Sequence, residues 1–118
     1  MTTPSYFSFQ QEENQEFVFE LTDESLIAHA RRILSGEEKN RVHVMGKIKE
    51  GTESYNPRWS YHLVPETIDF FDFAIEVCDA NMSYVEEHLD EAGGAFLPNY
   101  HWCPWSSKLV RELAESEK

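Results

Sequence analysis

The chain has 118 residues, of which 41% are hydrophobic and 14% are aromatic. A chain of this length forms one domain, and its apolar content is too high for a disordered segment. Its 22 acidic and 10 basic residues give a formal net charge of −12. Because such a charge repels phosphate groups, we expect no nucleic-acid partner and no membrane partner.

The cysteine count and the first residues bear on the compartment. Two cysteines in 118 residues are too few for a disulfide-rich scaffold. Residues 1–5 lack the basic start and the apolar core of a secretory signal, and no apolar run is long enough to cross a bilayer. We therefore predict a cytoplasmic location with both thiols free.

The N-terminal third of the chain gives clear local signals. Residues 1–15 are polar, and we expect them to be frayed, whereas residues 16–118 are expected to form a single domain. Phe17–Leu21 alternates between apolar and polar positions, which predicts a strand. Helical spacing of apolar residues, an acidic N-cap and a following glycine predict a helix over 24–35.

The rest of the chain predicts three further strands and two further helices. Alternating apolar residues indicate strands at 41–49, 58–64 and 67–78. Helical spacing indicates a second helix over about 79–92, closed by Gly93–Gly94, and a short final helix over about 106–113. The expected fold class is α+β, with an antiparallel sheet of about four strands packed on one face by two to three helices.

Aromatic residues gather in two short segments, each containing an Asn–Pro or Pro–Asn pair. These residues are Tyr55, Trp59, Tyr61, Tyr100, Trp102 and Trp105. If both segments meet at one end of the sheet, they form a concave surface that binds a peptide or small ligand. The competing interpretation is that the rings fill the core. We adopt the binding surface as the leading hypothesis and expect a basic or neutral partner, because the chain is acidic.

The alternative hypothesis is a thiol-dependent enzyme. Cys103 would be the nucleophile, and His101 or His62 would be its general base. The competing interpretation is a structural cysteine held between Trp102 and Trp105, since free cysteine commonly behaves as a small buried hydrophobe.

No metal site and no cofactor are predicted. Among the cysteines and histidines, only His101 and Cys103 approach the spacing of a zinc ligand pair, and no second pair exists. Residues 79–90 follow the outline of an EF-hand loop, but Tyr84 occupies the position that requires glycine. Calcium-dependent adhesion or signalling is therefore kept only as a third hypothesis.

Several motifs together resemble a known family. They are Arg41–Ile48, Tyr55–Leu63, Phe73–Asp79, Tyr84–Glu91, Phe96–Pro98 and Trp102–Lys108. The sequence resembles the N-terminal domain family named after a slime-mould calmodulin-binding protein of seventy-four kilodaltons, and it is similar to stand-alone bacterial members. The resemblance extends from about Phe17 to Leu113 and implies no catalytic residues.

The family name refers to calmodulin, but the residues do not favour calmodulin as a partner. A calmodulin target is a basic amphipathic helix. Both of the stronger predicted helices carry acidic residues on their exposed faces, and the C-terminal segment offers only Lys108 and Arg111. We therefore do not expect calmodulin binding.

Overall fold

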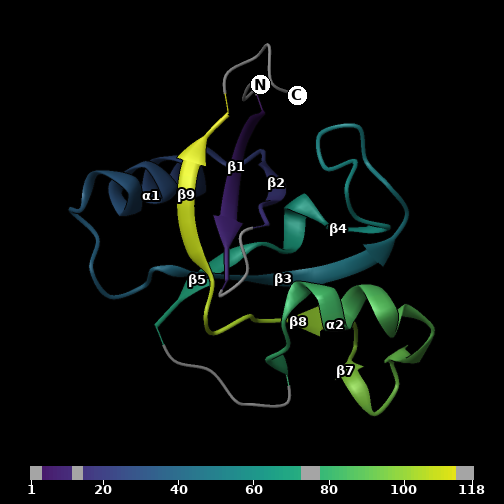
Figure 1. Ribbon diagram of the computed structural model, residues 1–118. Helices are drawn as coiled ribbons and strands as arrows, with labels where there is room; N and C mark the ends of the chain where they lie inside the picture. The colour runs from purple at the N-terminus through teal and green to yellow at the C-terminus, as the bar shows by residue number, and fades with distance from the viewer. Residues whose placement is uncertain (1–3, 12–14, 73–77, 114–118) are drawn as a thin grey trace.

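The computed structural model describes residues 4–11, 15–72 and 78–113 (Figure 1). In chain order the elements are β1 (Ser5–Gln10), β2 (Phe17–Leu21), α1 (Glu24–Ser35), β3 (His43–Glu50), β4 (Tyr61–Leu63), η1 (Pro65–Thr67), β5 (Asp69–Phe71), α2 (Met82–Glu87), η3 (Leu89–Glu91), β6 (Ala92–Gly93), β7 (Phe96–Pro98), β8 (His101–Trp102) and β9 (Lys108–Glu112). One sheet has the order β2-β1-β9, and a second is formed by β4, β5 and β8 around β3. The α+β class is confirmed, and its antiparallel strands form two larger sheets.

The first sheet joins segments from the two ends of the described chain. β1 pairs antiparallel with β2, so that Phe7 lies opposite Phe19 and Phe9 lies opposite Phe17. These four rings are fully buried, because alternate residues of a strand point to the same face. β9 pairs with the other edge of β1, and in Figure 1 β1 and β9 cross β3.

Two expectations about this sheet are wrong. Residues 5–10 form β1 instead of a frayed end, and residues 108–112 form β9 instead of a helix. The backbone N–H of Leu113 also donates to the carbonyl of Tyr6 at 2.8 Å. Each segment is stabilised by a strand partner that is distant in sequence, and such pairing outweighs local propensity.

β3 is the central strand of the second sheet. Its first residues pair with β5, Gly46 and Lys47 pair with β8, and Ile48 to Glu50 pair with β4, all antiparallel. Val44 and Ile48 are buried, while Lys47 and Lys49 are exposed. The one-sided alternation predicted for this strand is therefore present, and the exposed lysines lie on a single face.

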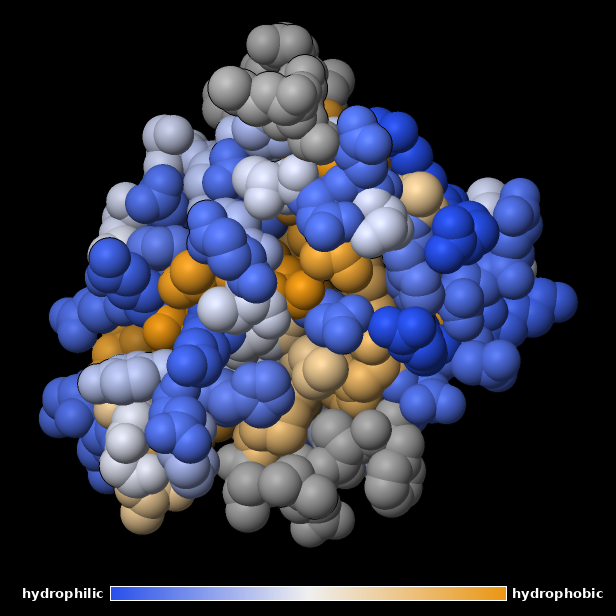
Figure 2. All heavy atoms as spheres, turned by 180° about the vertical axis from the view of Figure 1, so that it is seen from behind, coloured by the Kyte–Doolittle hydropathy of each residue, from blue (hydrophilic) through white to orange (hydrophobic). Residues whose placement is uncertain are grey.

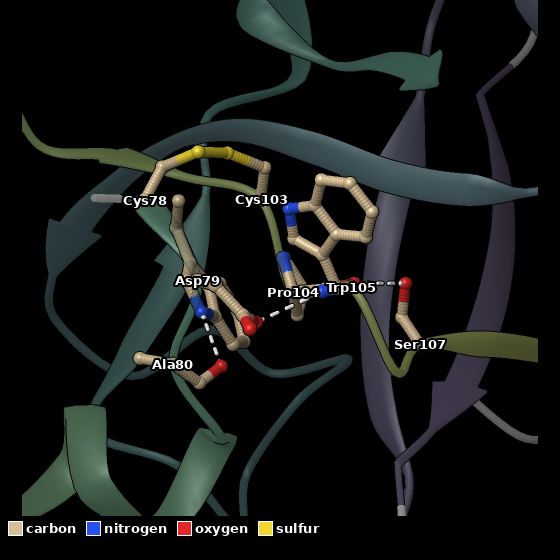
Figure 3. Close-up of a disulfide and its surroundings, with 8 residues drawn as sticks. Cys78, Asp79, Ala80, Cys103, Pro104, Trp105 and Ser107 are labelled. Carbon is tan, nitrogen blue, oxygen red and sulfur yellow. Dashed lines mark hydrogen bonds between the residues drawn. A yellow bond between two sulfur atoms is a disulfide. The ribbon is translucent and has the colours of Figure 1, made fainter. Parts of the chain in front are cut away.

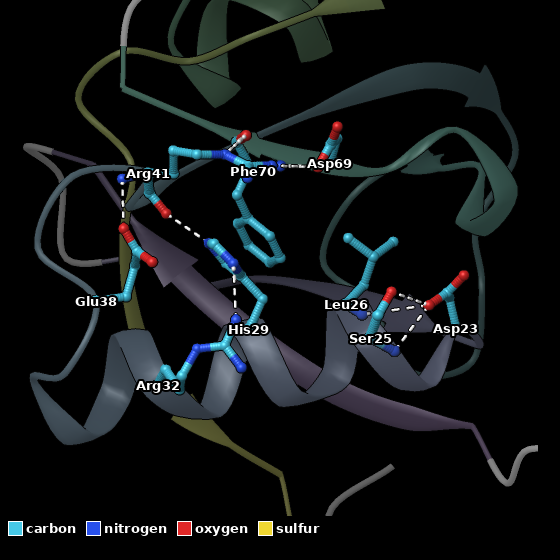
Figure 4. Close-up of polar contacts among 9 residues, drawn as sticks. All are labelled: Asp23, Ser25, Leu26, His29, Arg32, Glu38, Arg41, Asp69 and Phe70. Carbon is cyan, nitrogen blue, oxygen red and sulfur yellow. Dashed lines mark hydrogen bonds and ion pairs between the residues drawn. The ribbon is translucent and has the colours of Figure 1, made fainter.

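α1 has the bounds that the sequence predicts. The Asp23 carboxylate accepts hydrogen bonds from the backbone N–H groups of Ser25 and Leu26, at 2.8 and 3.3 Å, and also from the Ser25 hydroxyl. Gly36 ends the helix at φ +90°, a conformation that residues with a Cβ rarely adopt. Figure 4 shows His29 pointing from α1 toward the carbonyl of Arg41, 2.9 Å away.

The N-cap of α1 gives α1 an expected pH dependence. Its hydrogen bonds with Ser25 and Leu26 lower the pKa of Asp23 below the ordinary aspartate value. The stabilisation is therefore present above the pKa of the unfolded chain and is lost as the pH falls through the lowered folded-state pKa. We expect wild type to be more stable than Asp23→Asn at neutral pH, with a difference that shrinks at acidic pH. Urea denaturation across this range measures the difference, and a pH-independent difference would contradict the assignment.

The predicted second helix is shorter than expected. α2 begins after Asn81, whose side chain accepts a hydrogen bond from the N–H of Tyr84 at 2.8 Å. It ends at Glu87 and is followed by η3. The predicted strand over 67–78 is present as β5, and residues 73–77 lie outside the described residues.

The core lies between the two sheets and α1. Phenylalanines of β1 and β2 meet Tyr61 of β4 and Trp102 of β8, and α1 adds Ile27 and Ala30. His29 stacks on Phe70 of β5 with ring centres 4.9 Å apart. Within the described residues, the helices are too short or too polar to cross a membrane.

Candidate functional site

Four of the six aromatic residues predicted to bind a ligand are buried in the structure. Tyr61 and Trp102 are fully buried, Trp59 is 4% exposed and Tyr55 is 8% exposed. Burial is the main cause that raises the pKa of the Tyr55 hydroxyl above its ordinary value. These four rings therefore do not form the predicted binding surface.

The two aromatic segments do meet, but they meet inside the molecule. The rings of Tyr61 and Trp102 lie 5.6 Å apart, and both contact Phe17 of the other sheet at 5.1 and 5.3 Å. The indole N–H of Trp59 donates to the carbonyl of Glu16 at 3.1 Å. The rings join the two sheets, which is the core interpretation of this aromatic cluster.

The remaining two predicted rings are separate from one another in their surroundings. Trp105 is half-buried and contacts Phe71 edge-to-face at 5.9 Å. Tyr100 is 50% exposed. Figure 2 shows one face of the molecule, where hydrophilic residues predominate and hydrophobic ones reach the surface between them. Among the described residues, the large hydrophobic side chains that are exposed are Tyr84, Tyr100 and Val110.

Cys103 is not a free thiol. It forms a disulfide with Cys78, 25 residues earlier in the chain, and the pair is buried (Figure 3). The expectation of two free thiols is wrong, and a disulfide sulfur has no thiolate with which to act as nucleophile. His101 lies near this pair, whereas the Nδ1 of His62 is 2.9 Å from the carbonyl of Gly51. The structure therefore does not assemble the predicted Cys103 and His62 pair.

An open cavity of about 540 Å³ lies beside Tyr100. The lining residues come from β3, from the segment around η1, from η3 and from the turn between β7 and β8. They are Lys47, Ile48, Lys49, Glu50, Val64, Thr67, Leu89, Asp90, Ala92, Asn99 and Tyr100. This volume is within the range of small-molecule sites. Tyr100 is the predicted binding residue that the cavity retains.

The turn that carries Tyr100 has an unusual backbone. Leu97, Asn99 and Tyr100 have φ angles of +47°, +60° and +63°, in the left-handed region that non-glycine residues rarely occupy. Such residues persist only where the surrounding structure holds them, and they concentrate at functional sites. Here the Tyr100 N–H donates to the carbonyl of Leu97 at 2.9 Å, and the Ile48 N–H donates to the carbonyl of Tyr100 at 2.9 Å.

Gly93 allows the Tyr100 ring to occupy its position. A Cβ on Gly93 would lie 2.4 Å from the Cζ atom of Tyr100, and the glycine has φ +92°. The residue has no room for a side chain and adopts a backbone conformation that favours glycine. The ring therefore packs directly on the backbone of β6 and is held at the cavity.

The charged residues of the cavity balance one another. Lys47 and Lys49 oppose Glu50 and Asp90, so the lining has no formal net charge although the whole chain carries −12. Thr67 adds a hydroxyl and Asn99 adds an amide. The cavity thus offers hydrogen-bond donors and acceptors and one exposed ring.

Sequence reasoning misses most of these lining residues. The alternation of β3 places Lys47 and Lys49 on its solvated face, but nothing local indicates that residues 89–100 return to that face. The useful signal is the Gly93–Gly94 pair, which by its position predicts only the end of a helix. In the structure, Gly93 instead supports the ring of Tyr100.

Comparisons with known proteins identify the family of the chain. Neither the curated proteins nor the solved structures give a significant match. The family model for the N-terminal domain of the binding protein of seventy-four kilodaltons matches residues 3–116. Because this match covers nearly the whole sequence, the chain belongs to that N-terminal domain family, the one that its motifs resemble.

Proposed function

We propose that the domain is a non-enzymatic binding module that holds a small neutral saccharide in the cavity beside Tyr100. The observation that carries this proposal is an open cavity of about 540 Å³ with a ring held at its wall. The sequence predicts a peptide or small ligand bound by aromatic loops. The proposal keeps a small ligand and relies on the one aromatic residue of that set that lines the cavity.

The chemistry of the lining favours a neutral polar ligand. Two ammonium groups and two carboxylates give no net charge that would select an ion. A sugar ring has hydroxyl groups around its edge, which pair with donors and acceptors such as those of Lys49, Asp90 and Asn99. Its C–H face is apolar and can pack on the exposed ring of Tyr100.

The lining residues also favour binding over catalysis. None of the described residues that line the cavity is a serine, cysteine or histidine. These residue types supply most nucleophiles and general bases. The turn from Leu97 to Tyr100 is held by backbone hydrogen bonds and by the Gly93 contact, so less conformational entropy is lost when a ligand binds.

The Cys78–Cys103 disulfide supports a different compartment from the cytoplasm that the cysteine count predicts. Disulfides persist in oxidising surroundings and are rare where thiols are kept reduced. We therefore place the functional domain in an oxidising compartment, where neutral saccharides of cell surfaces and matrices are accessible ligands. The acidic net charge of the chain disfavours nucleic acid and anionic membranes as partners.

Titration of the isotope-labelled protein with sugars tests the proposal. The probes are glucose, galactose, N-acetylglucosamine and chitobiose, with trialanine as the peptide comparison. We expect at least one sugar to shift the backbone amide resonances of Lys47–Glu50 and Asn99–Tyr100. Tyr100→Ala should weaken that binding by about tenfold or more, since it removes the packing surface.

Tyr84→Ala is the matched control for this titration. Tyr84 is 47% exposed and lies on α2, outside the cavity lining, so its replacement should leave sugar binding unchanged. If no sugar shifts the cavity resonances, or if both tyrosine variants weaken binding equally, the proposal is wrong. A response to trialanine alone would show that the cavity is a peptide site.

A further inference from the structure

Three side chains with soft-metal ligand atoms lie together away from the Tyr100 cavity. The sulfur atoms of Cys78 and Cys103 and a ring nitrogen of His101 all lie within 4.8 Å of one another. Both cysteines are buried and His101 is half-buried. The disulfide uses the two sulfurs and leaves the imidazole beside them without a part in the bond.

The backbone around this cluster is joined by contacts that do not depend on the disulfide. The N–H of Cys103 donates to the carbonyl of Cys78 at 2.8 Å. The indole N–H of Trp102 donates to the carbonyl of Ala80 at 2.9 Å, and the N–H of Trp105 donates to the Asp79 carboxylate at 3.0 Å (Figure 3).

His101 is positioned separately, by the second sheet. β8 pairs with β3, and in that pairing His101 lies opposite Lys47. Cutting the sulfur–sulfur bond therefore leaves both chain segments and the imidazole in place. The three ligand atoms remain close together after reduction, which is the condition for a preformed metal site.

We propose that the reduced form of the domain binds one Zn²⁺ ion through Cys78, His101 and Cys103. Two thiolates and one imidazole are a ligand set that zinc prefers, and water completes the tetrahedral geometry. Zinc–sulfur bonds of about 2.3 Å need the sulfurs roughly 3.8 Å apart, so the cysteine side chains must rotate away from each other after reduction. The same residues then form a disulfide in oxidising surroundings and a zinc site in reducing ones.

The chemistry balances in two steps. In the test, a water-soluble phosphine takes the place of a cellular dithiol as reductant. The phosphine donates two electrons to the disulfide and takes oxygen from one water molecule, which leaves a phosphine oxide and two thiols. Zinc binding then releases both thiol protons, because only thiolates coordinate the metal.

The experiment compares oxidised and phosphine-reduced protein at neutral pH. Zinc affinity is measured by competition with a coloured chelator, and cobalt replaces zinc to give the absorption of cobalt–thiolate bonds. We expect one ion per reduced chain and no binding by the oxidised chain. His101→Ala should lower the zinc affinity of reduced protein by about tenfold or more and should keep the cobalt–thiolate absorption.

His88→Ala is the matched control, because His88 lies next to α2 and its Nδ1 atom is 2.8 Å from the Tyr84 carbonyl. Its zinc affinity should equal that of wild type. Equal loss in both histidine variants, or equal binding by oxidised protein, would overturn the site. Near-ultraviolet circular dichroism follows the core, and loss of the folded signal on reduction that zinc does not restore would also overturn it.

Discussion

Replacing Cys78 and Cys103 together with alanine is expected to lower the free energy of unfolding by about 3 to 4 kcal/mol. The disulfide closes a loop with a sequence separation of 25 residues, so it removes conformational freedom from the unfolded chain. It also joins the segment after β5 to the segment after β8, on opposite sides of α2 in sequence. Urea denaturation of wild type and variant, analysed with their own slopes, measures the difference.

Reduction of wild type provides the control for this comparison. A phosphine reductant should lower the urea midpoint of wild type toward that of the double variant. The double variant itself should not respond to the reductant, because it has no disulfide. An unchanged midpoint of wild type under full reduction, verified by thiol counting, would contradict the stabilising role of the disulfide.

The disulfide could not have been predicted from the sequence. Two cysteines 25 residues apart do not reveal whether the fold brings them together. Their low number favours a reducing compartment, and both the free-thiol and the cytoplasmic expectations rest on that inference. The chain meets neither local spacing rules for zinc nor those for small disulfide frameworks, so only the pairing of β8 with β3 reveals the contact.

The elements predicted correctly are those specified by neighbouring residues. β2 follows from the alternation of Phe17–Leu21, and α1 follows from Asp23, an apolar stripe and Gly36. β1 and β9 escape prediction because each is stable through its pairing with the other, across almost the whole chain. Sequence periodicity over five or six residues is too short to outweigh such a long-range contact.

The candidate site shows the same limit. The sequence identifies an aromatic cluster, but spacing does not distinguish a ring that faces the core from one that faces solvent. Trp102 and Tyr100 are two residues apart, yet Trp102 is fully buried and Tyr100 is 50% exposed. The positive φ angles of the turn before β8 separate them, and those angles occur at non-glycine residues that give no local signal.

Trp102 is the residue whose truncation is expected to have the largest effect on stability. Its ring contacts Phe9, Phe17 and Tyr61 at centre distances of 5.8, 5.3 and 5.6 Å. Because these partners come from both sheets, Trp102→Ala opens a cavity where the sheets meet and should lower the free energy of unfolding by about 3 to 5 kcal/mol. Urea denaturation followed by circular dichroism measures this loss without relying on tryptophan fluorescence.

Two further variants separate the contributions of this ring. Trp102→Phe retains aromatic packing but loses the hydrogen bond to the Ala80 carbonyl, so its cost should be nearer 1 to 2 kcal/mol, roughly that of one buried hydrogen bond with some lost packing. Tyr100→Ala should cost less than about 1 kcal/mol, since half of that side chain is already exposed. If Trp102→Ala cost no more than Tyr100→Ala, Trp102 could not be the ring that joins the two sheets. The aromatic cluster would then have to be a surface after all, as its composition first suggested.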